Sequence, residues 1–383
     1  MINSLQLLFG IWLGMLSLPG EKLPFNFDLQ NVNGKIVMII HNAEERIKCD
    51  DVTSSGDSLF IRVPVFDSEF RVKISNKKMS GIWINYGRKG NPSIPFEAEY
   101  NNANRFPATK KPTINVSGRW EVWFDEGTPD SSLAIGVFKQ IDEKVTGTFL
   151  TETGDHRFLE GIVNGDSLML SVFDGSHCWL YKSHVTNDRM NGVQWSGLTY
   201  KGSWKAKRNV DIQLRNPETI SHVEGQLAFT FPDVDSNLVS LSDARFKNKV
   251  VIIQIMGSWC PNCMDETAFL SDYYNKHHEE GLEIIGLAFE RFPEFAKASL
   301  NVKRVAKRFD VHYPLLIAGI SGKENVSKII PQLKDFISFP TCIFIDRNGK
   351  VQEVHAGFSG PATGADYEQF IRKFSLRVTQ MLR

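Results

Sequence analysis

The chain has 383 residues, more than one hydrophobic core usually serves, so we expect two or three domains. Hydrophobic residues make up 42% of it and charged residues 23%, which is typical of a soluble globular protein. The 44 Lys and Arg residues balance the 44 Asp and Glu residues, so the composition gives no reason to expect binding to nucleic acid. Five cysteines are too few for a fold that disulfides hold together.

The chain begins with an apolar stretch at residues 5–19. It has the length of a signal-peptide core and is too short to span a bilayer comfortably. We therefore predict a signal peptide over residues 1–20, and a protein that is secreted or anchored at its N-terminus. No basic residue precedes the stretch and no A-x-A site follows it, so the alternative is a buried N-terminal strand or helix.

Residues 23–208 alternate polar and apolar side chains in short runs, such as 59–63 and 144–150. Gly, Asn and Asp separate these runs, and no apolar stripe of helical period interrupts them. The pattern predicts an all-β domain, either a barrel or a sandwich.

The β region contains an internal repeat. Three short blocks recur in the same order and at nearly constant separation: 57–60 (DSLF) as 166–169 (DSLM), 65–68 (VFDS) as 172–175 (VFDG), and 79–83 (MSGIW) as 190–195 (MNGVQW). We predict two similar halves, residues 23–105 and 115–208, joined by a polar linker near 101–112. The Phe-Asp pairs of the second block either line a shared site or occupy turn and core positions.

From residue 222 to 383, apolar runs alternate with helical segments, which predicts an α/β layer. The run 250–255 is continuous, as in a buried strand. The expected helices are 261–278, 293–309 and one from 366 to the end; the other expected strands are 282–289, 313–317 and a hairpin of 341–345 and 350–354 around an Asn-Gly turn. The fold class is therefore multidomain, with an internally duplicated all-β region followed by an α/β domain.

A Cys-Pro-Asn-Cys motif lies where the first of these buried strands passes into a helix. Unpaired N–H groups and the dipole at a helix start stabilise a thiolate, so Cys260 is the expected nucleophile. Cys263, three residues on, is close enough to resolve a mixed disulfide. Pro261 suits the first helical turn, where its missing N–H costs nothing. We predict that Cys260 and Cys263 form a redox-active disulfide.

The same two cysteines are also half of a possible zinc site. Such a site needs two more ligands, and the sequence has no second CxxC pair. His277 and His278 are adjacent and would project from a helix in different directions. We therefore expect neither a metal nor a cofactor.

Together, Trp259 to Cys263 and the downstream Phe339-Pro340-Thr341 resemble the thioredoxin superfamily, in particular the TlpA/ResA-like extracytoplasmic thiol–disulfide oxidoreductases. Residues 239–243 (VSLSD) are similar to the segment that opens those domains, and the resemblance covers 222–383. It implies a thioredoxin-like fold, with Pro340 as a cis-proline that contacts the substrate together with Trp259, Pro261 and Phe339. The alternative for Pro340 is an ordinary trans proline that starts a strand. The alternative for Trp259 is a residue that only packs within the protein.

The resemblance also implies partners and a location. The substrates would be thiols and disulfides of partner proteins. A membrane-bound electron donor would keep the dithiol reduced, and the compartment would be the bacterial periplasm. The CPNC motif does not set the reduction potential, so the direction of electron flow stays open, with reduction of partners as the expectation.

Glu266 matches an acidic residue that is typical of the ResA-like branch. It lies three residues after Cys263, so a helix places both on one face. Its carboxylate would accept the proton that Cys263 must lose; the alternative is a solvated surface charge. Gln254 occupies the buried strand position where thioredoxins proper carry an acid, which disfavours a thioredoxin-type proton relay.

The other three cysteines have less defined roles. Cys342 falls within an apolar strand and is expected to be buried and inert. Cys49 and Cys178 lie in different halves of the β region and would be able to pair in an oxidising compartment.

Two other functions are possible. A peroxiredoxin-like peroxidase would need Pro and Thr or Ser in P-x-x-x-[T/S]-x-x-C, but Ile253 and Gly257 stand at those positions. A binding module is the second alternative, because the β region loosely resembles lipocalin-type barrels that hold apolar ligands. In combination with the redox domain, the β region would select partners or act as a spacer.

Overall fold

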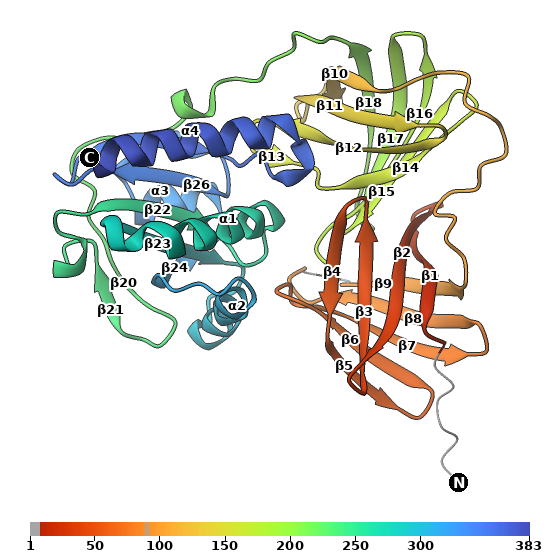
Figure 1. Cartoon of the computed structure of the whole chain (residues 1–383), viewed down its shortest axis with the longest axis horizontal. Helices are drawn as coiled ribbons and strands as arrows, with labels where there is room; N and C mark the ends of the chain where they lie inside the picture. The colour runs from red at the N-terminus through yellow and green to blue at the C-terminus, as the bar shows by residue number, and fades with distance from the viewer. Residues whose placement is uncertain (1–7, 89, 91) are drawn as a thin grey trace. The chain divides into compact units, whose positions relative to one another are not determined.

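The computed structural model describes residues 8–88, 90 and 92–383. The chain forms two compact units (Figure 1). The first consists of the residues up to Leu150 together with His156–Gln213. The second consists of Thr151–Asp155 together with Leu214–Arg383. An all-β region is therefore followed by an α/β domain, as the sequence predicts.

Two nine-stranded sheets account for the β region within the described residues. The strands of the first are β1 (Gly10–Leu18), β2 (Glu21–Val32), β3 (Lys35–Asn42), β4 (Glu45–Cys49), β5 (Asp51–Ser55), β6 (Ser58–Val63), β7 (Ser68–Ser75), β8 (Lys78–Asn85) and β9 (Ser93–Tyr100). Those of the second are β10 (Gly118–Phe124), β11 (Ser132–Ile141), β12 (Lys144–Thr151), β13 (Gly154–Asp155), β14 (Leu159–Asn164), β15 (Ser167–Phe173), β16 (Cys178–Thr186), β17 (Arg189–Ser196) and β18 (Tyr200–Arg208).

The two sheets have the same topology. The first has the order β4-β3-β2-β1-β9-β8-β7-β6-β5, and each of its neighbour pairs recurs between the corresponding strands of the second. In the second sheet β12 also pairs with both β11 and β14, which closes a barrel. The predicted internal duplication is thus confirmed by strand order as well as by sequence.

Glycines within the repeat allow neighbouring strands to approach closely. Gly81 in β8 and Gly192 in β17 occupy the same place in the third repeated block. A Cβ on Gly81 would overlap the carbonyl of Arg71, and one on Gly192 would lie 2.5 Å from the carbonyl oxygen of Lys182. A side chain at either position would force the strands apart.

Aromatic side chains fill the interior of both sheets. In the first, Trp12, Phe25, Phe27, Phe70 and Trp83 are fully buried. A second cluster has the same character and is made by Trp120, Phe149, Tyr181 and Trp204. These large rings pack closely, so side chains fill the interior of both sheets. In a lipocalin, by contrast, the interior of the barrel holds the ligand.

The N-terminal apolar stretch is a strand of the first sheet. β1 pairs with β2 on one side and with β9 on the other, and Trp12 and Leu16 have no exposed surface. Such a strand is apolar on both faces, which is why it resembles the core of a signal peptide. The prediction of a removable signal peptide is wrong for residues 10–18, and the alternative of a buried strand is confirmed. Residues 1–7 of that prediction lie outside the described residues.

The segment between the two sheets is also buried in part. We predicted a polar linker near residues 101–112, but Arg105 and Phe106 are only 5% and 7% exposed. Arg105 donates hydrogen bonds to the carbonyl oxygens of Ser171 and His41 and is paired with Glu160. The linker therefore contributes to the core of the first unit.

The second unit contains a central sheet with the order β24-β23-β22-β26-β27. β22 pairs in parallel with β23 and antiparallel with β26. The elements are β19 (His222–Val223), β20 (Thr230–Pro232), β21 (Leu238–Ser240), β22 (Val250–Met256), α1 (Pro261–His277), β23 (Leu282–Glu290), α2 (Phe295–Arg308), β24 (Leu315–Ile320), α3 (Lys323–Ile329), β25 (Leu333–Lys334), β26 (Thr341–Ile345), β27 (Val351–Ala356) and α4 (Ala365–Leu382).

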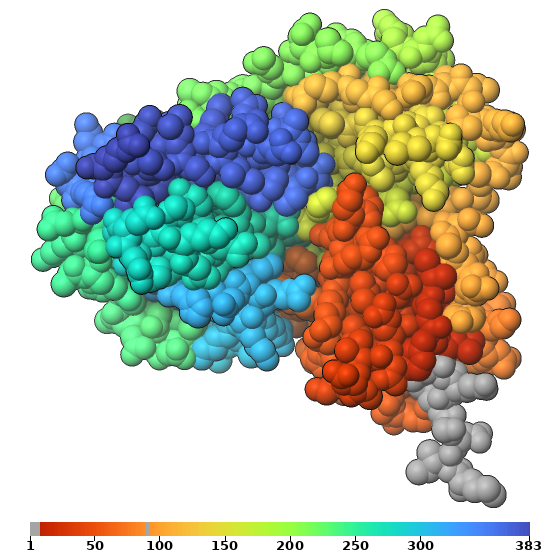
Figure 2. Space-filling model, in the orientation of Figure 1, coloured from red at the N-terminus to blue at the C-terminus, as the bar shows by residue number. Residues whose placement is uncertain are grey.

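Helices cover both faces of this sheet. α1 and α4 pack together through Phe269 and Phe374, whose ring centroids lie 4.9 Å apart, and Phe374 also contacts Phe344 of β26. On the opposite face, α3 packs with Val251, Ile253 and Ile255 of β22. Figure 2 shows α4, in dark blue, at the surface. Its residue Leu376 is 61% exposed. None of the helices in the described part is both long and apolar enough to cross a membrane.

The α/β elements match the sequence prediction in order. The predicted helices 261–278 and 293–309 correspond to α1 and α2, and the expected hairpin is β26 and β27 around Gly349 at φ 78°. The strand predicted at 313–317 begins two residues later, as β24. The short elements α3, β19, β20, β21 and β25 were not predicted, because a few residues carry too little periodicity.

Replacing Trp12 by Ala tests whether the N-terminal stretch belongs to the fold. Trp12 is fully buried, so the variant should lower the free energy of unfolding by about 3 to 5 kcal/mol. Phe9→Ala is the matched control, because Phe9 is 40% exposed and its loss should cost less than about 0.5 kcal/mol. Urea unfolding followed by circular dichroism measures both. Equal stability of the two variants would contradict the assignment of residues 10–18 to the sheet.

Candidate active site

The Cys-Pro-Asn-Cys motif lies at the junction of β22 and α1. All seven residues of β22 are buried, and the chain turns through Gly257-Ser258-Trp259 into the helix. Cys260 is the N-cap of α1, and its Sγ accepts a hydrogen bond from the backbone N–H of Cys263 at 3.2 Å. Cys260 and Cys263 form a disulfide, with Cα atoms 5.2 Å apart. In the reduced state, the same N–H and the helix dipole would stabilise a thiolate on Cys260.

The loop before β26 lies against the disulfide. The Phe339–Pro340 peptide is cis, and the carbonyl oxygen of Phe339 is 3.6 Å from Cys260 Sγ. The loop is held at both ends: Thr341 Oγ1 donates to Ser338 O at 2.8 Å, and Gly357 N donates to Pro340 O at 2.8 Å. Phe339 and Pro340 are thus brought next to the dithiol, as expected from the resemblance.

Trp259 packs beside the same loop. Its indole Nε1 donates to Phe289 O at 2.9 Å, and its ring meets Phe339 edge-on, with centroids 5.4 Å apart. The guanidinium of Arg291 lies 4.7 Å from the centre of the indole. Trp259 is partly exposed, so it both packs and presents surface next to Cys260. Pro261 is buried at the first position of α1.

Glu266 is buried beneath the dithiol and is not a surface charge. It is 1% exposed, and Gln254 Nε2 donates to its Oε2 at 2.9 Å. Thr267 Oγ1 in turn donates to Gln254 Oε1 at 3.1 Å, which fixes the orientation of that amide. Burial raises the pKa of Glu266 to about 7, although hydrogen bonds from Gln254 and Cys342 lower it in part. A carboxyl with this pKa can exchange a proton near neutral pH.

Cys342 shares the environment of Glu266. It lies on β26 opposite Gln254 and is buried, as predicted. Burial raises the pKa of its thiol well above the usual value, and the nearby Glu266 raises it further. Cys342 is therefore a neutral thiol that faces the carboxyl. The other cysteines, Cys49 and Cys178, are both buried, and the possible disulfide between them is not formed.

Glu290 is a further residue of the site that the sequence analysis missed. It ends β23 and is 1% exposed, and it accepts hydrogen bonds from Ser258 N at 2.8 Å and Ser258 Oγ at 2.6 Å. Burial raises its pKa above the ordinary value. Glu290 thus holds the turn that precedes Cys260. The available signal was a charged residue directly after an apolar run of strand length.

One group of potential metal ligands occurs within the described residues, and it contains no cysteine. Glu218, Glu353 and His355 have ligand atoms within 4.8 Å of one another. Glu353 is already paired with Arg377, and burial lowers the pKa of His355 to about 4. The guanidinium of Arg377 competes with a cation for Glu353, so we assign no metal to this group.

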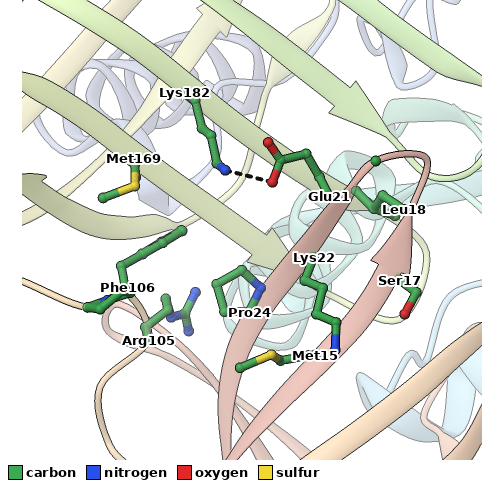
Figure 3. A pocket seen from close by; sticks show the side chains of 12 residues that line it. Met15, Ser17, Leu18, Glu21, Lys22, Pro24, Arg105, Phe106, Met169 and Lys182 are labelled. Carbon is green, nitrogen blue, oxygen red and sulfur yellow. Dashed lines mark hydrogen bonds and ion pairs between the residues drawn. The ribbon is translucent and has the colours of Figure 1, made fainter.

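A pocket of about 670 Å³ lies on the first unit (Figure 3). Met15, Pro24, Phe106 and Met169 supply apolar surface, and Lys182 and Glu21 are joined by an ion pair of 2.6 Å at its side. The pocket is outside the aromatic cores. The repeated Phe-Asp blocks do not line it: Phe173 belongs to the core, and Asp174 is paired with His177.

The fold and the dithiol together define the class of the C-terminal domain. A CxxC disulfide at a helix start follows a central buried strand, and a cis-proline loop lies against the sulfur of Cys260. This is the arrangement of a thioredoxin-like thiol–disulfide oxidoreductase.

Comparisons with known proteins agree with this class. Residues 224–371 match the Redoxin family model and form a Redoxin domain. The thiol-disulfide oxidoreductase ResA of Bacillus cereus (strain ATCC 10987 / NRS 248) is 29% identical over 177 residues, which are 46% of this chain and 86% of that protein. The thioredoxin-like protein YneN of Bacillus subtilis is 28% identical over 138 residues, 35% of this chain and 72% of that protein.

Two solved structures are similar to part of this chain. A putative thiol:disulfide interchange protein DsbE from Chlorobium tepidum is 19% identical and covers 41% of this chain and 99% of its own, with a TM-score of 0.32. A putative protein disulfide isomerase from Bacteroides thetaiotaomicron is 24% identical and covers 42% of this chain and 92% of its own, with a TM-score of 0.31.

Glu266 should make the stability of the oxidised protein depend on pH. Its folded pKa of about 7 lies above the ordinary 4.5, so the folded state holds the proton more tightly than the unfolded state. The resulting stabilisation is complete below pH 4.5 and is lost as pH rises through 7, by about 3 kcal/mol. Urea unfolding between pH 5 and pH 8 should show this decline in the wild type and not in Glu266→Gln.

Glu279→Gln is the matched control, because it removes one carboxyl from an exposed position of the same domain. It should retain the wild-type dependence on pH. A Glu266→Gln variant that declines as steeply as the wild type would show that Glu266 is already ionised at pH 5.

Proposed function

We propose that this protein reduces disulfide bonds of partner proteins outside the cytoplasm, with Cys260 as nucleophile and Cys263 as resolving thiol. The observation that carries the proposal is the position of Cys260 at the N-cap of α1, where its sulfur accepts the N–H of Cys263. A group in this position attacks as a thiolate at a pH where most thiols are protonated. The location outside the cytoplasm rests on the resemblance to the ResA-like proteins.

The reaction has two displacement steps. The Cys260 thiolate attacks one sulfur of the partner disulfide, which forms a mixed disulfide and releases the other partner sulfur as a thiolate. Cys263 then loses its proton and attacks Cys260 Sγ. This step forms the Cys260–Cys263 disulfide and releases the second partner thiol, so two electrons pass to the partner. A membrane-bound donor of two electrons would restore the dithiol.

Glu266 is the proposed acceptor of the Cys263 proton. Its carboxyl lies on the same helical face as Cys263, and its pKa of about 7 suits proton transfer near neutral pH. Gln254 would hold the carboxyl in place without adding a second charge. Trp259, Pro261, Phe339 and Pro340 would contact the partner around the disulfide. The carbonyl oxygen of Phe339 is next to Cys260 Sγ, Trp259 packs against Phe339, and Pro261 and Pro340 follow Cys260 and Phe339 in the chain.

Single replacements of the two cysteines separate their roles. Cys260→Ser should abolish reduction of protein disulfides, because no nucleophile remains. Cys263→Ser should accumulate mixed disulfides with partners, visible on non-reducing gels and released by dithiothreitol. Cys49→Ala controls for the loss of a thiol far from the motif in sequence and should retain activity. Turnover by Cys260→Ser at the wild-type rate would refute the assignment.

The reduction potential of the Cys260/Cys263 couple tests the direction of electron flow. A reductant should equilibrate with glutathione near the potential of thioredoxin, about −270 mV, or below it. Titration against glutathione redox buffers, followed by the fluorescence of the adjacent Trp259, measures this value. A potential near that of the strong oxidant DsbA, about −120 mV, would reverse the proposed direction.

A further inference from the structure

Five residues from the β region belong to the same compact unit as the redox domain. This segment, Thr151–Asp155, joins Leu214–Arg383 in the second unit. Thr151 fixes its shape: Thr151 Oγ1 donates to Gly154 O at 2.9 Å and accepts from Thr153 N at 3.3 Å. The segment is therefore a preformed turn.

Asn262 of the Cys-Pro-Asn-Cys motif binds this turn. Its amide nitrogen donates to Asp155 O at 3.3 Å, and its amide oxygen accepts from Asp155 N at 2.8 Å. One side-chain amide thus satisfies both backbone groups of one residue, in the way that a neighbouring strand would. Gly154, at φ 146°, makes this approach possible, because a Cβ there would overlap the end of Asn262.

The loop that follows β27 holds the other side of the turn. Gly360 N donates to a carboxylate oxygen of Asp155 at 2.7 Å, and Asp155 is 3% exposed. A Cβ on Gly357 would lie 2.9 Å from Glu152 O, so the two backbones are in direct contact. Gly357 N in turn donates to Pro340 O, which ties this loop to the cis-proline beside Cys260.

An ion pair anchors the start of the turn. Arg215 Nε lies 2.6 Å from Glu152 Oε1, and its Nη2 binds the other oxygen of the same carboxylate. The hydrogen bond from Arg215 lowers the pKa of Glu152. The turn is thus held at three places. Arg215 pairs with the carboxylate of Glu152, Gly357 packs against the backbone of Glu152 and Thr153, and Asn262 and Gly360 bind Asp155.

We propose that Thr151–Asp155 is a built-in barrier beside the dithiol that restricts which protein disulfides reach Cys260. The inference rests on the proposed function and adds substrate selection to it. The amide of Asn262 and the N–H of Gly360 are polar groups that an extended partner would pair with, and Asp155 already satisfies both. A partner must therefore approach from the side of Trp259 and Phe339. This favours disulfides on narrow, extended segments and excludes those on broad folded surfaces.

Weakening the barrier should broaden the range of substrates. Asp155→Ala removes the acceptor of the Gly360 N–H while the backbone contacts with Asn262 remain. Loss of one such hydrogen bond should raise the population with a displaced turn about fivefold. The readout is the ratio of two second-order rate constants of the reduced full-length protein, one for insulin and one for glutathione disulfide.

This ratio should rise about fivefold in Asp155→Ala and also rise in Gly154→Ala. The matched controls should keep the wild-type ratio. Asp155→Asn retains an oxygen that accepts the Gly360 N–H, and Gly349→Ala places a Cβ at another positive-φ turn with nothing within 4 Å. If the ratio of the insulin rate constant to the glutathione disulfide rate constant is unchanged or lower in Asp155→Ala, the proposal that this turn is a barrier is wrong.

Hydrogen exchange keeps this test separate from the proposed function. The amide of Gly360 should exchange faster in Asp155→Ala than in Asp155→Asn, whether or not the protein reduces any disulfide. Equal exchange would show that the turn is not bound there and would also overturn the inference. Failure of wild-type protein to reduce either disulfide faster than Cys260→Ser would instead reject the proposed function, and the inference with it.

Discussion

The active site depends on one structural constraint: α1 begins directly where the buried strand β22 ends. This junction makes Cys260 the N-cap, so its sulfur receives the unpaired N–H groups of the first turn. The helical period then sets the positions of the next two site residues. Cys263 lies one turn further on, and Glu266 one turn after that, on the face that packs against the sheet. Glu290 and the cis-proline loop both contact this junction, at Ser258 and Cys260 respectively.

The same geometry explains why Gln254 suits this site. Gln254 faces α1 from β22, and its amide reaches both Glu266 Oε2 and Cys263 O. A carboxyl at position 254 would place two acids in one buried space, and repulsion would raise the pKa of one of them further. The amide instead donates a hydrogen bond to Glu266 and carries no charge. One buried acid with a pKa of about 7 then lies one helical turn after Cys263, the thiol that has to lose a proton in the proposed reaction.

The sequence was sufficient for features that short segments encode. The CPNC motif, its place between strand and helix, and the register that brings Glu266 under Cys263 all follow from consecutive residues. Glu290 and the turn at Thr151–Asp155 could not be inferred in this way. Ser258 meets Glu290 and Asn262 meets Asp155 across long separations in the chain, and no local pattern indicates either pair.

The error at the N-terminus has a different origin. β1 is paired on both sides and carries apolar residues on both faces, although Ile11, Met15 and Ser17 are only partly buried. Its sequence therefore has little alternation of polar and apolar residues. Over residues 10–18 it is therefore indistinguishable from the core of a signal peptide by composition alone. Only the pairing of β1 with β2 and β9 separates the two interpretations, and the partners lie up to 88 positions apart, as for Trp12 and Tyr100.

The duplicated β region shows how far a sequence repeat predicts structure. The repeated blocks indicate two equivalent halves, and the strand orders agree. The halves are nevertheless not independent, because Phe173 and Cys178 of the second sheet belong to the core of the first. Ser68 Oγ donates to Gly175 O at 2.7 Å, so the two copies of one repeated block bind each other. Residues that the repeat makes equivalent thus form an interface, and the two sheets must fold as one unit.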